Sequence, residues 1–141
     1  MSAKSFVDTN VLVYAATARE DSPEKYRRAK DILAYGDICL STQVIGEFVN
    51  TVQNRRKMSR PLTVVETMKW LDRLFKFPVV VVDRAIVEGA MMVQQRYQLS
   101  YWDSQIVAAA ERSGAELLYS EDMNHGQLYG PVRCENPFHL H

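Results

Sequence analysis

The chain has 141 residues, of which 47% are hydrophobic and 24% charged, and these values are ordinary for one globular domain with a single core. Lys and Arg number 17, as do Asp and Glu, so the formal net charge is zero and bulk basicity gives no argument for a nucleic-acid partner. The two cysteines, Cys39 and Cys134, are too few for a disulfide framework or a zinc site, and we expect reduced thiols.

The sequence contains no targeting or membrane-spanning signal. The first ten residues, "MSAKSFVDTN", lack an apolar segment long enough for a signal peptide. No stretch approaches the roughly 20 apolar residues that cross a bilayer. With no internal repeat, low-complexity tract or linker, we expect a single domain over residues 1–141, a cytoplasmic location and no membrane association.

Short apolar runs predict strands at residues 4–8, 37–41, 77–83 and 115–120. The run of four valines at 79–82 is typical of a central strand that is buried on both faces.

Segments with helical periodicity lie between these strands, at residues 23–36, 42–53, 64–77, 84–98 and 104–114. Their start signals are Ser22 before Pro23, a capping box of Thr63 and Glu66, Asp83, and Ser100 with Asp103. The alternation predicts an α/β domain with a mostly parallel sheet.

Acidic residues occur where the predicted parallel strands end. Asp8 closes the first strand, Asp122 follows the strand at 115–120, and Asp103 opens a helix. Glu47 lies in the first turns of the helix that follows the second strand. The carboxyl ends of parallel strands meet at one edge of a sheet, so these four side chains can converge there. Their mutual repulsion would be relieved by a hard divalent cation with oxygen ligands, Mg²⁺ or Mn²⁺.

Each acid also has a purely structural interpretation. Asp8 can cap the helix that follows it, and Asp103 can be the acidic half of a capping box. Asp122 can be a turn residue in "SEDMNHG". Glu47 can lie on a solvated helix face, although its apolar neighbours favour a position near the buried stripe. The joint pattern favours the metal site over these alternatives.

Four segments in this order, "FVDTNVLVYA", "LSTQVIGEF", "LSYWDSQIVAAA" and "LLYSEDMNHG", resemble the motif regions of PIN-domain ribonucleases. The resemblance extends from Phe6 to the "NPF" at 136–138 and is closest to the toxin subunits of VapBC-type toxin–antitoxin modules. It implies a PIN-like, Rossmann-like α/β/α sandwich, dependence on Mg²⁺ or Mn²⁺, and endonucleolytic cleavage of RNA.

The resemblance also implies roles for individual residues. Four acids match the metal-binding and catalytic positions: Asp8, Glu47, Asp103 and Asp122. Three polar residues match positions that support them: Asn10, Ser41 and Ser120. Glu121 adds a fifth carboxylate beside the site, and whether it contacts metal directly or through water stays open. Glu47 either completes the metal shell or orients the attacking water, and one or two ions are possible.

Two basic segments are candidates for binding phosphate. The first contains Arg55, Arg56, Lys57 and Arg60, and it is either a contact for RNA or a solvated charge run at the end of a helix. For the second, Lys25 to Lys30, we expect a solvated face or a contact with an acidic partner. Tyr101 and Trp102 can stack on a base, but core packing is the expectation, as is a turn role for His125.

The toxin resemblance implies a cognate antitoxin and a homodimer. The antitoxin would lie across apolar grooves near the Glu47 helix and the helix at 63–76, where Trp70, Leu74 and Phe77 can line a groove or pack in the core. Small and Met residues in "VEGAMMVQQRY" offer a surface for helix pairing.

Two other functions compete with the metal-dependent ribonuclease. One is a catalytically weak PIN-like module that binds RNA or protein, which has no need for four acids. The other is a phosphatase or phosphotransferase with Asp8 as nucleophile, which is disfavoured because Asn10 stands where a second acid is usual and no Gly-rich phosphate loop is present.

Overall fold

The computed structural model describes residues 4–139, and its strands form one sheet in the order β3-β2-β1-β4-β6-β5. The strands of this part of the chain are β1 (Lys4–Val7), β2 (Asp37–Ser41), β3 (Val79–Val80), β4 (Leu117–Tyr119), β5 (Leu128–Tyr129) and β6 (Val132–Glu135). All neighbouring pairs are parallel except β5 with β6. The predicted α/β class with a mostly parallel sheet is therefore confirmed.

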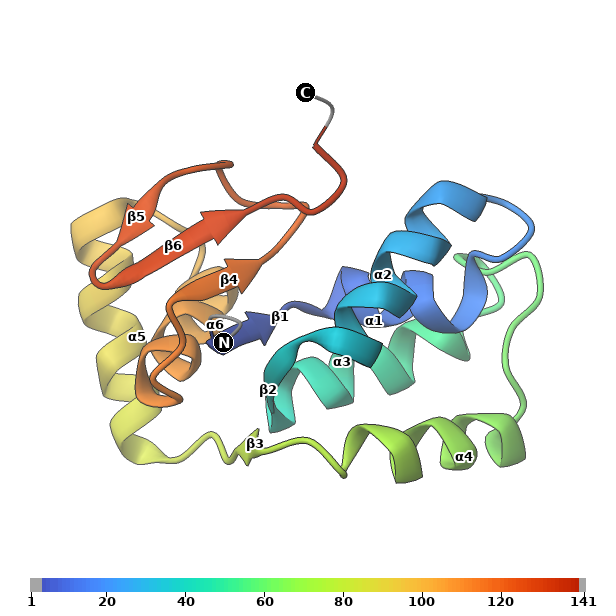
Figure 1. Cartoon of the computed structure of the whole chain (residues 1–141). Coiled ribbons are helices and arrows are strands. Elements are labelled where there is room, and N and C mark those ends of the chain that lie inside the picture. The colour runs from blue at the N-terminus through green and yellow to red at the C-terminus, as the bar shows by residue number, and fades with distance from the viewer. Residues whose placement is uncertain (1–3, 140–141) are drawn as a thin grey trace.

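Helices connect the parallel strands and cover the sheet. They are α1 (Thr9–Thr17), α2 (Pro23–Tyr35), α3 (Thr42–Val52), α4 (Val64–Leu74), α5 (Arg84–Tyr97) and α6 (Tyr101–Arg112). Figure 1 shows α5 and α6 together on the left of the molecule and α1 to α4 on the right, with β1 between the two groups. Within the described range, no helix has the length and hydropathy needed to cross a membrane.

The core is centred on β1 and its neighbours, because parallel strands covered by helices are shielded from water on both faces. Phe6 and Val7 of β1, Leu40 of β2 and Leu118 of β4 have no exposed surface. Cys39 in β2 and Cys134 in β6 are buried and unbridged, as expected from the sequence.

The predicted helix starts are largely correct. Thr63 and Glu66 form a complete capping box at α4. Asp83 Oδ1 accepts a hydrogen bond from the Ile86 N–H at 3.0 Å, which caps α5. At α2, Pro23 occupies the first helical position as predicted, but the Ser22 side chain makes no capping hydrogen bond.

The valine run at 79–82 was wrongly predicted to be a central strand. Only Val79 and Val80 pair with another strand, and that strand is β2, so β3 lies at the edge of the sheet. Val81, directly after β3, is 65% exposed. β-Branched residues favour extended backbone at an edge as well as at the centre, so composition does not separate the two.

The hairpin of β5 and β6 was missed. Its strands are short, and they flank Gly130, which has φ of 61°, and Pro131. The Gly-Pro pair is a turn signal that, with the apolar residues on either side, could have indicated it.

Replacing Thr63 by Ala should destabilise the protein by about 1 kcal/mol, because the N–H of Glu66 loses its acceptor at the start of α4. Thr63→Ser keeps a hydroxyl at the same position and should cost much less. Urea unfolding of both variants measures the difference. Equal losses in the two variants would show that the methyl group, and not the cap, is responsible.

Candidate active site

Asp8 is a buried carboxylate at the carboxyl end of β1. Its backbone N–H continues the pairing with β4 by donating to Tyr119 O at 2.9 Å. Its Oδ1 accepts from the Thr9 N–H at 2.7 Å, which caps α1, and its Oδ2 accepts from Ser120 Oγ at 2.7 Å. Burial, together with the charges of Asp122 and Glu47, raises the pKa of Asp8 to about 7 despite these two hydrogen bonds. Asp8 is therefore both a helix cap and part of an acidic group.

The other three acids surround the same edge of the sheet. Glu47 lies at the surface on α3 with its carboxyl group partly shielded from water, and its Oε1 accepts from Thr9 Oγ1 at 3.2 Å. Asp103 lies half-buried in the first turn of α6. Burial is the main cause that raises the pKa of Glu47 and of Asp103, and the negative charge of Asp122 raises both further. Asp122 therefore lies within electrostatic range of each of the other three carboxylates.

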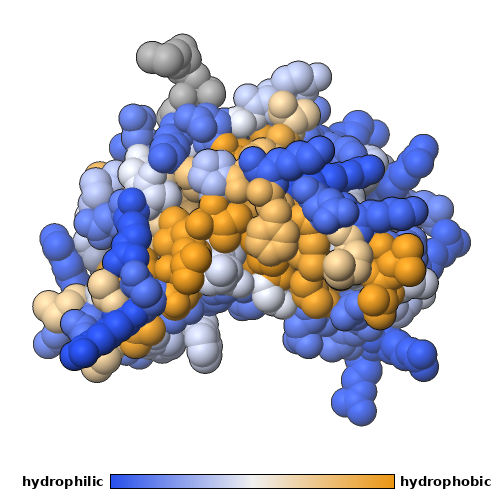
Figure 2. All heavy atoms as spheres, turned by 90° about the horizontal axis from the view of Figure 1, so that it is seen from below, coloured by the Kyte–Doolittle hydropathy of each residue, from blue (hydrophilic) through white to orange (hydrophobic). Residues whose placement is uncertain are grey.

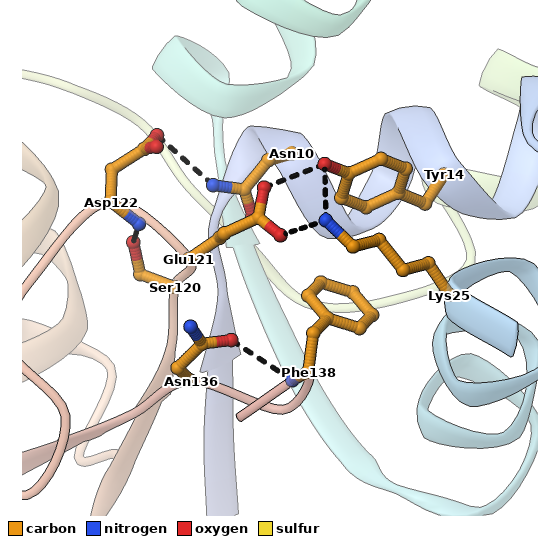
Figure 3. Close-up of polar contacts among 8 residues, drawn as sticks. All are labelled: Asn10, Tyr14, Lys25, Ser120, Glu121, Asp122, Asn136 and Phe138. Atoms are coloured by element: carbon orange, nitrogen blue, oxygen red, sulfur yellow. Dashed lines mark hydrogen bonds and ion pairs between the residues drawn. The ribbon is translucent and has the colours of Figure 1, made fainter. Parts of the chain in front are cut away.

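Ser120 and Asn10 tie Asp122 to this group. The Asp122 N–H donates to Ser120 Oγ at 3.2 Å, and the same hydroxyl donates to Asp8. Asn10 Nδ2 donates to Asp122 Oδ2 at 3.0 Å (Figure 3). One short segment after β4 thus orients two of the acids through a single buried hydroxyl group.

Glu121 points to different partners. Its Oε1 accepts from Tyr14 OH at 2.6 Å and its Oε2 lies 2.6 Å from Lys25 Nζ (Figure 3). The Lys25 ammonium also lies over the rings of Tyr14 and Phe138, at 4.8 and 5.6 Å from their centroids. Both oxygens of Glu121 are therefore held by α1 and α2, away from a metal-binding role.

These contacts of Glu121 were missed from the sequence. Tyr14 and Lys25 stand 107 and 96 positions from Glu121, and no local pattern connects such distant residues. The hydrogen bond from Thr9 to Glu47 was missed for the same reason. The sequence expectation of a solvated or partner-facing segment at 25–30 is wrong for Lys25.

Some predicted residues lie elsewhere. Ser41 Oγ accepts from the Val44 N–H at 3.3 Å and caps α3, and among the described residues it forms no hydrogen bond with a carboxylate. The basic residues at 55–60 follow the far end of α3, about 16 Å along that helix from its capping residue Ser41. Arg60 pairs there with Glu20. His125 is in a turn, where its Nδ1 accepts from the Asn136 N–H at 3.0 Å.

The residues fit a hydrated divalent cation better than a closed metal cage. Between residues 4 and 139, no group of three or more His, Cys, Asp or Glu side chains is arranged to hold a metal ion. Mg²⁺ commonly uses only one or two carboxylates and keeps several water ligands. The donors here are all oxygens, and Asn10 Oδ1 is buried without a hydrogen-bond partner. An unsatisfied buried oxygen beside repelling carboxylates is the environment that a cation would relieve.

The fold and the site together define an α/β protein with an acidic cluster at the carboxyl edge of a parallel sheet. The chain belongs to the PIN domain family, whose model matches residues 5–130. This confirms the resemblance seen in the sequence motifs.

Solved structures agree with this fold. A toxin–antitoxin complex from Klebsiella pneumoniae shares 20% identity with a TM-score of 0.68, over 96% of this chain and 99% of that one. VapC20 from Mycobacterium tuberculosis, described as a sarcin-ricin loop cleaving toxin, shares 22% identity with a TM-score of 0.65, over 84% and 89%. FitAcB from Neisseria gonorrhoeae shares 20% with a TM-score of 0.60, over 96% and 99%. No curated protein matches the chain.

In EDTA, the free energy of unfolding should fall as the pH rises from about 4 through about 7. The Asp8 carboxyl stays protonated in the folded protein up to a pKa of about 7, whereas in the unfolded chain it ionises near 3.8. The contribution of the protonated Asp8 to the free energy of unfolding is therefore complete below pH 3.8 and is lost above about pH 7. Between these values this group lowers the free energy of unfolding by up to about 1.4 kcal/mol per pH unit.

Asp8→Asn should flatten this dependence, because an amide does not titrate in this range and Asn still caps a helix. Urea unfolding at several pH values measures both proteins. An unchanged slope in the variant would mean that other groups cause the pH dependence.

Proposed function

We propose that this chain is an Mg²⁺- or Mn²⁺-dependent endoribonuclease and the toxin of a toxin–antitoxin pair. The supporting observation is the group of four carboxylates at the carboxyl edge of the sheet: Asp8, Glu47, Asp103 and Asp122. In the described part of the chain, no basic side chain forms an ion pair with any of them. A scaffold or binding module gains nothing from such repulsion, whereas perturbed carboxylates are common at functional sites.

In this proposal Asp8, Asp103 and Asp122 hold a hydrated cation, some of them through its water ligands, and Glu47 either joins them or orients the attacking water. When bound, the cation offsets the repulsion between the carboxylates and stabilises negative charge on the phosphate. Ser120 holds Asp8 and Asp122 in place before any cation binds, and Thr9 holds Glu47. Glu121 is not a ligand in this proposal, because Lys25 and Tyr14 occupy its oxygens.

The purified protein should cut a labelled total-RNA pool with Mg²⁺ or Mn²⁺ and leave it intact in EDTA. Asp103→Asn should lower the cleavage rate by at least about 100-fold, the effect of removing one group that stabilises transition-state charge. Asp103 suits this test better than Asp8, because Asp8 also caps α1 and is buried. Gel analysis of the RNA over time measures the rates.

Asp72→Asn is the matched control, since Asp72 is exposed on α4 and the chemical change is identical. It should cleave at the wild-type rate. Cleavage that survives EDTA, or an equal loss in both variants, would contradict the proposal. No cleavage by protein that is folded and free of antitoxin would favour the module that only binds RNA or protein.

A groove between α2 and α4 supports the antitoxin part of the proposal. It has a volume of about 390 Å³ and is lined by Lys30, Leu33, Ala34, Trp70, Arg73, Leu74, Lys76 and Phe77. The apolar residues include the three expected from the sequence, and the rim carries three cations. An apolar groove with a basic rim suits an amphipathic helix that carries acidic residues. The Klebsiella relative was solved as a toxin–antitoxin complex.

Exposed apolar side chains give two further contact surfaces. Figure 2 shows apolar side chains gathered on the face seen from below, the side of α4 and β3. The exposed apolar residues of α4 and of the segments that directly follow α4 and β3 are Val64, Val65, Met68, Phe75 and Val81. On α5, Val87, Met91 and Met92 are exposed. Patches of this kind mark protein contacts. We assign the α4 side to the antitoxin and the α5 surface to a second copy of the chain.

Arg73→Glu should weaken inhibition of RNA cleavage by the cognate antitoxin about tenfold, because the reversed charge would repel an acidic helix in the groove. A tenfold loss of affinity corresponds to about 1.4 kcal/mol of binding free energy. The measurement is the antitoxin concentration that halves the cleavage rate of each variant. Arg27→Glu, at an exposed position of α2 outside the groove lining, is the control. Equal effects of the two variants would contradict this location for the antitoxin.

A further inference from the structure

Trp102 is exposed beside the acidic cluster. It is the second residue of α6 and directly precedes Asp103, and the residue is 63% exposed. The sequence expectation of core packing is therefore wrong for this residue. Burying an indole contributes one of the largest favourable free energies of any side chain, and an exposed Trp102 does not make this contribution to folding. An exposed tryptophan is therefore a candidate for a contact with a ligand.

At least one face of this indole is open for stacking, because 63% of the residue is exposed. The ring of Tyr101 lies 5.1 Å away at an angle of 79°, so it does not lie flat on Trp102. Among residues 4–139, no other ring and no Lys or Arg cation lies against the indole. Trp70 differs in this respect, because Lys30 and Arg73 lie over its ring at 5.8 and 5.1 Å. Within the described residues, cations lie over the ring of Trp70 but not over that of Trp102.

The backbone of Trp102 is fixed to the helix that carries Glu47. Gln43 Nε2 of α3 donates to Trp102 O at 3.1 Å. Gln105 Nε2 donates to Gln43 Oε1 at 2.8 Å, and Tyr101 OH donates to Gln105 Oε1 at 2.8 Å. Gln43 also lies close enough to the Glu47 carboxylate to lower its pKa. This network holds the start of α6 in register with the acidic cluster.

We propose that Trp102 is a stacking site for an unpaired base of the bound RNA, next to the bond that is cut. The proposal rests on the ribonuclease function above and adds to it a residue that contacts a base of the substrate. A phosphate at the carboxylates brings its own nucleotide near the first turn of α6, where Trp102 and Asp103 follow one another although their side chains leave the helix in different directions. Bases in a duplex already stack on one another, so a face for an aromatic side chain exists only in single-stranded segments. Stacking tolerates any base, so the site selects unpaired RNA rather than a sequence.

The test uses protein labelled with 5-fluorotryptophan in EDTA, where the fluorine resonances of Trp70 and Trp102 are assigned with the variants Trp70→Phe and Trp102→Phe. The probes are a single-stranded 12-residue RNA of mixed sequence, the same RNA as a duplex, and an abasic oligonucleotide of equal length and charge. The Trp102 resonance should shift with the single strand and much less with the other two. The Trp70 resonance should not move with any of them.

Affinity for the single strand, measured by fluorescence anisotropy, should fall about 5- to 150-fold in Trp102→Ala, the range found when one stacked base loses its aromatic partner. Trp102→Phe keeps a ring and should restore most of the affinity. The affinity for the abasic oligonucleotide should be the same in all three proteins. This comparison separates stacking from a general structural defect, which would weaken both ligands.

Several results would overturn the inference. They are equal shifts with the abasic oligonucleotide, unchanged affinity in Trp102→Ala, or a Trp102 resonance that responds only to antitoxin or to protein concentration. If one of these results is found and the wild-type protein still cuts RNA with Mg²⁺, the stacking role of Trp102 is contradicted but the ribonuclease function is not. If the wild type neither binds nor cuts RNA, the proposed function fails with it.

Discussion

The hydrogen bond from Ser120 Oγ to Asp8 Oδ2 is the contact on which the site depends. It joins the ends of β1 and β4, two adjacent strands at the centre of the sheet, through a buried carboxylate. The same hydroxyl accepts from the Asp122 N–H and so sets the start of the segment that carries Asp122. A charge at this depth is costly, and the pKa of about 7 for Asp8 expresses that cost.

The remaining polar groups divide into two sets with different tasks. Thr9, Asn10 and Ser120 hold acids toward the edge of the sheet, where repulsion between carboxylates is left unrelieved. Lys25 and Tyr14 hold Glu121 on the other side of the same segment. The segment after β4 is thus held on both sides, and Glu121 helps to keep that segment in place instead of adding a further charge to the cluster.

The proposed RNA-binding and antitoxin-binding surfaces lie on different parts of the molecule. The acidic edge and Trp102 lie where strands end and α6 begins, whereas the groove lined by Trp70 and Leu74 lies between α2 and α4. Each tryptophan belongs to one of these surfaces. In the proposed function, RNA and antitoxin contact different helices, so inhibition would need a segment of antitoxin that reaches the acidic edge or a change transmitted through α1, which packs on α2 and α3.

The sequence by itself determined the alternation of strands and helices up to residue 120, the caps at Thr63 and Asp83, and the placement of acids after strands. These follow from local periodicity, from hydrogen bonding within one turn, and from the direction of parallel strands. Only the tertiary structure decided that Val79 and Val80 form an edge strand, that Glu121 pairs with Lys25, and that Trp102 is exposed. The physical reason is that burial and pairing depend on which residues the packed elements bring together, and partners 96 positions apart leave no trace in a local pattern.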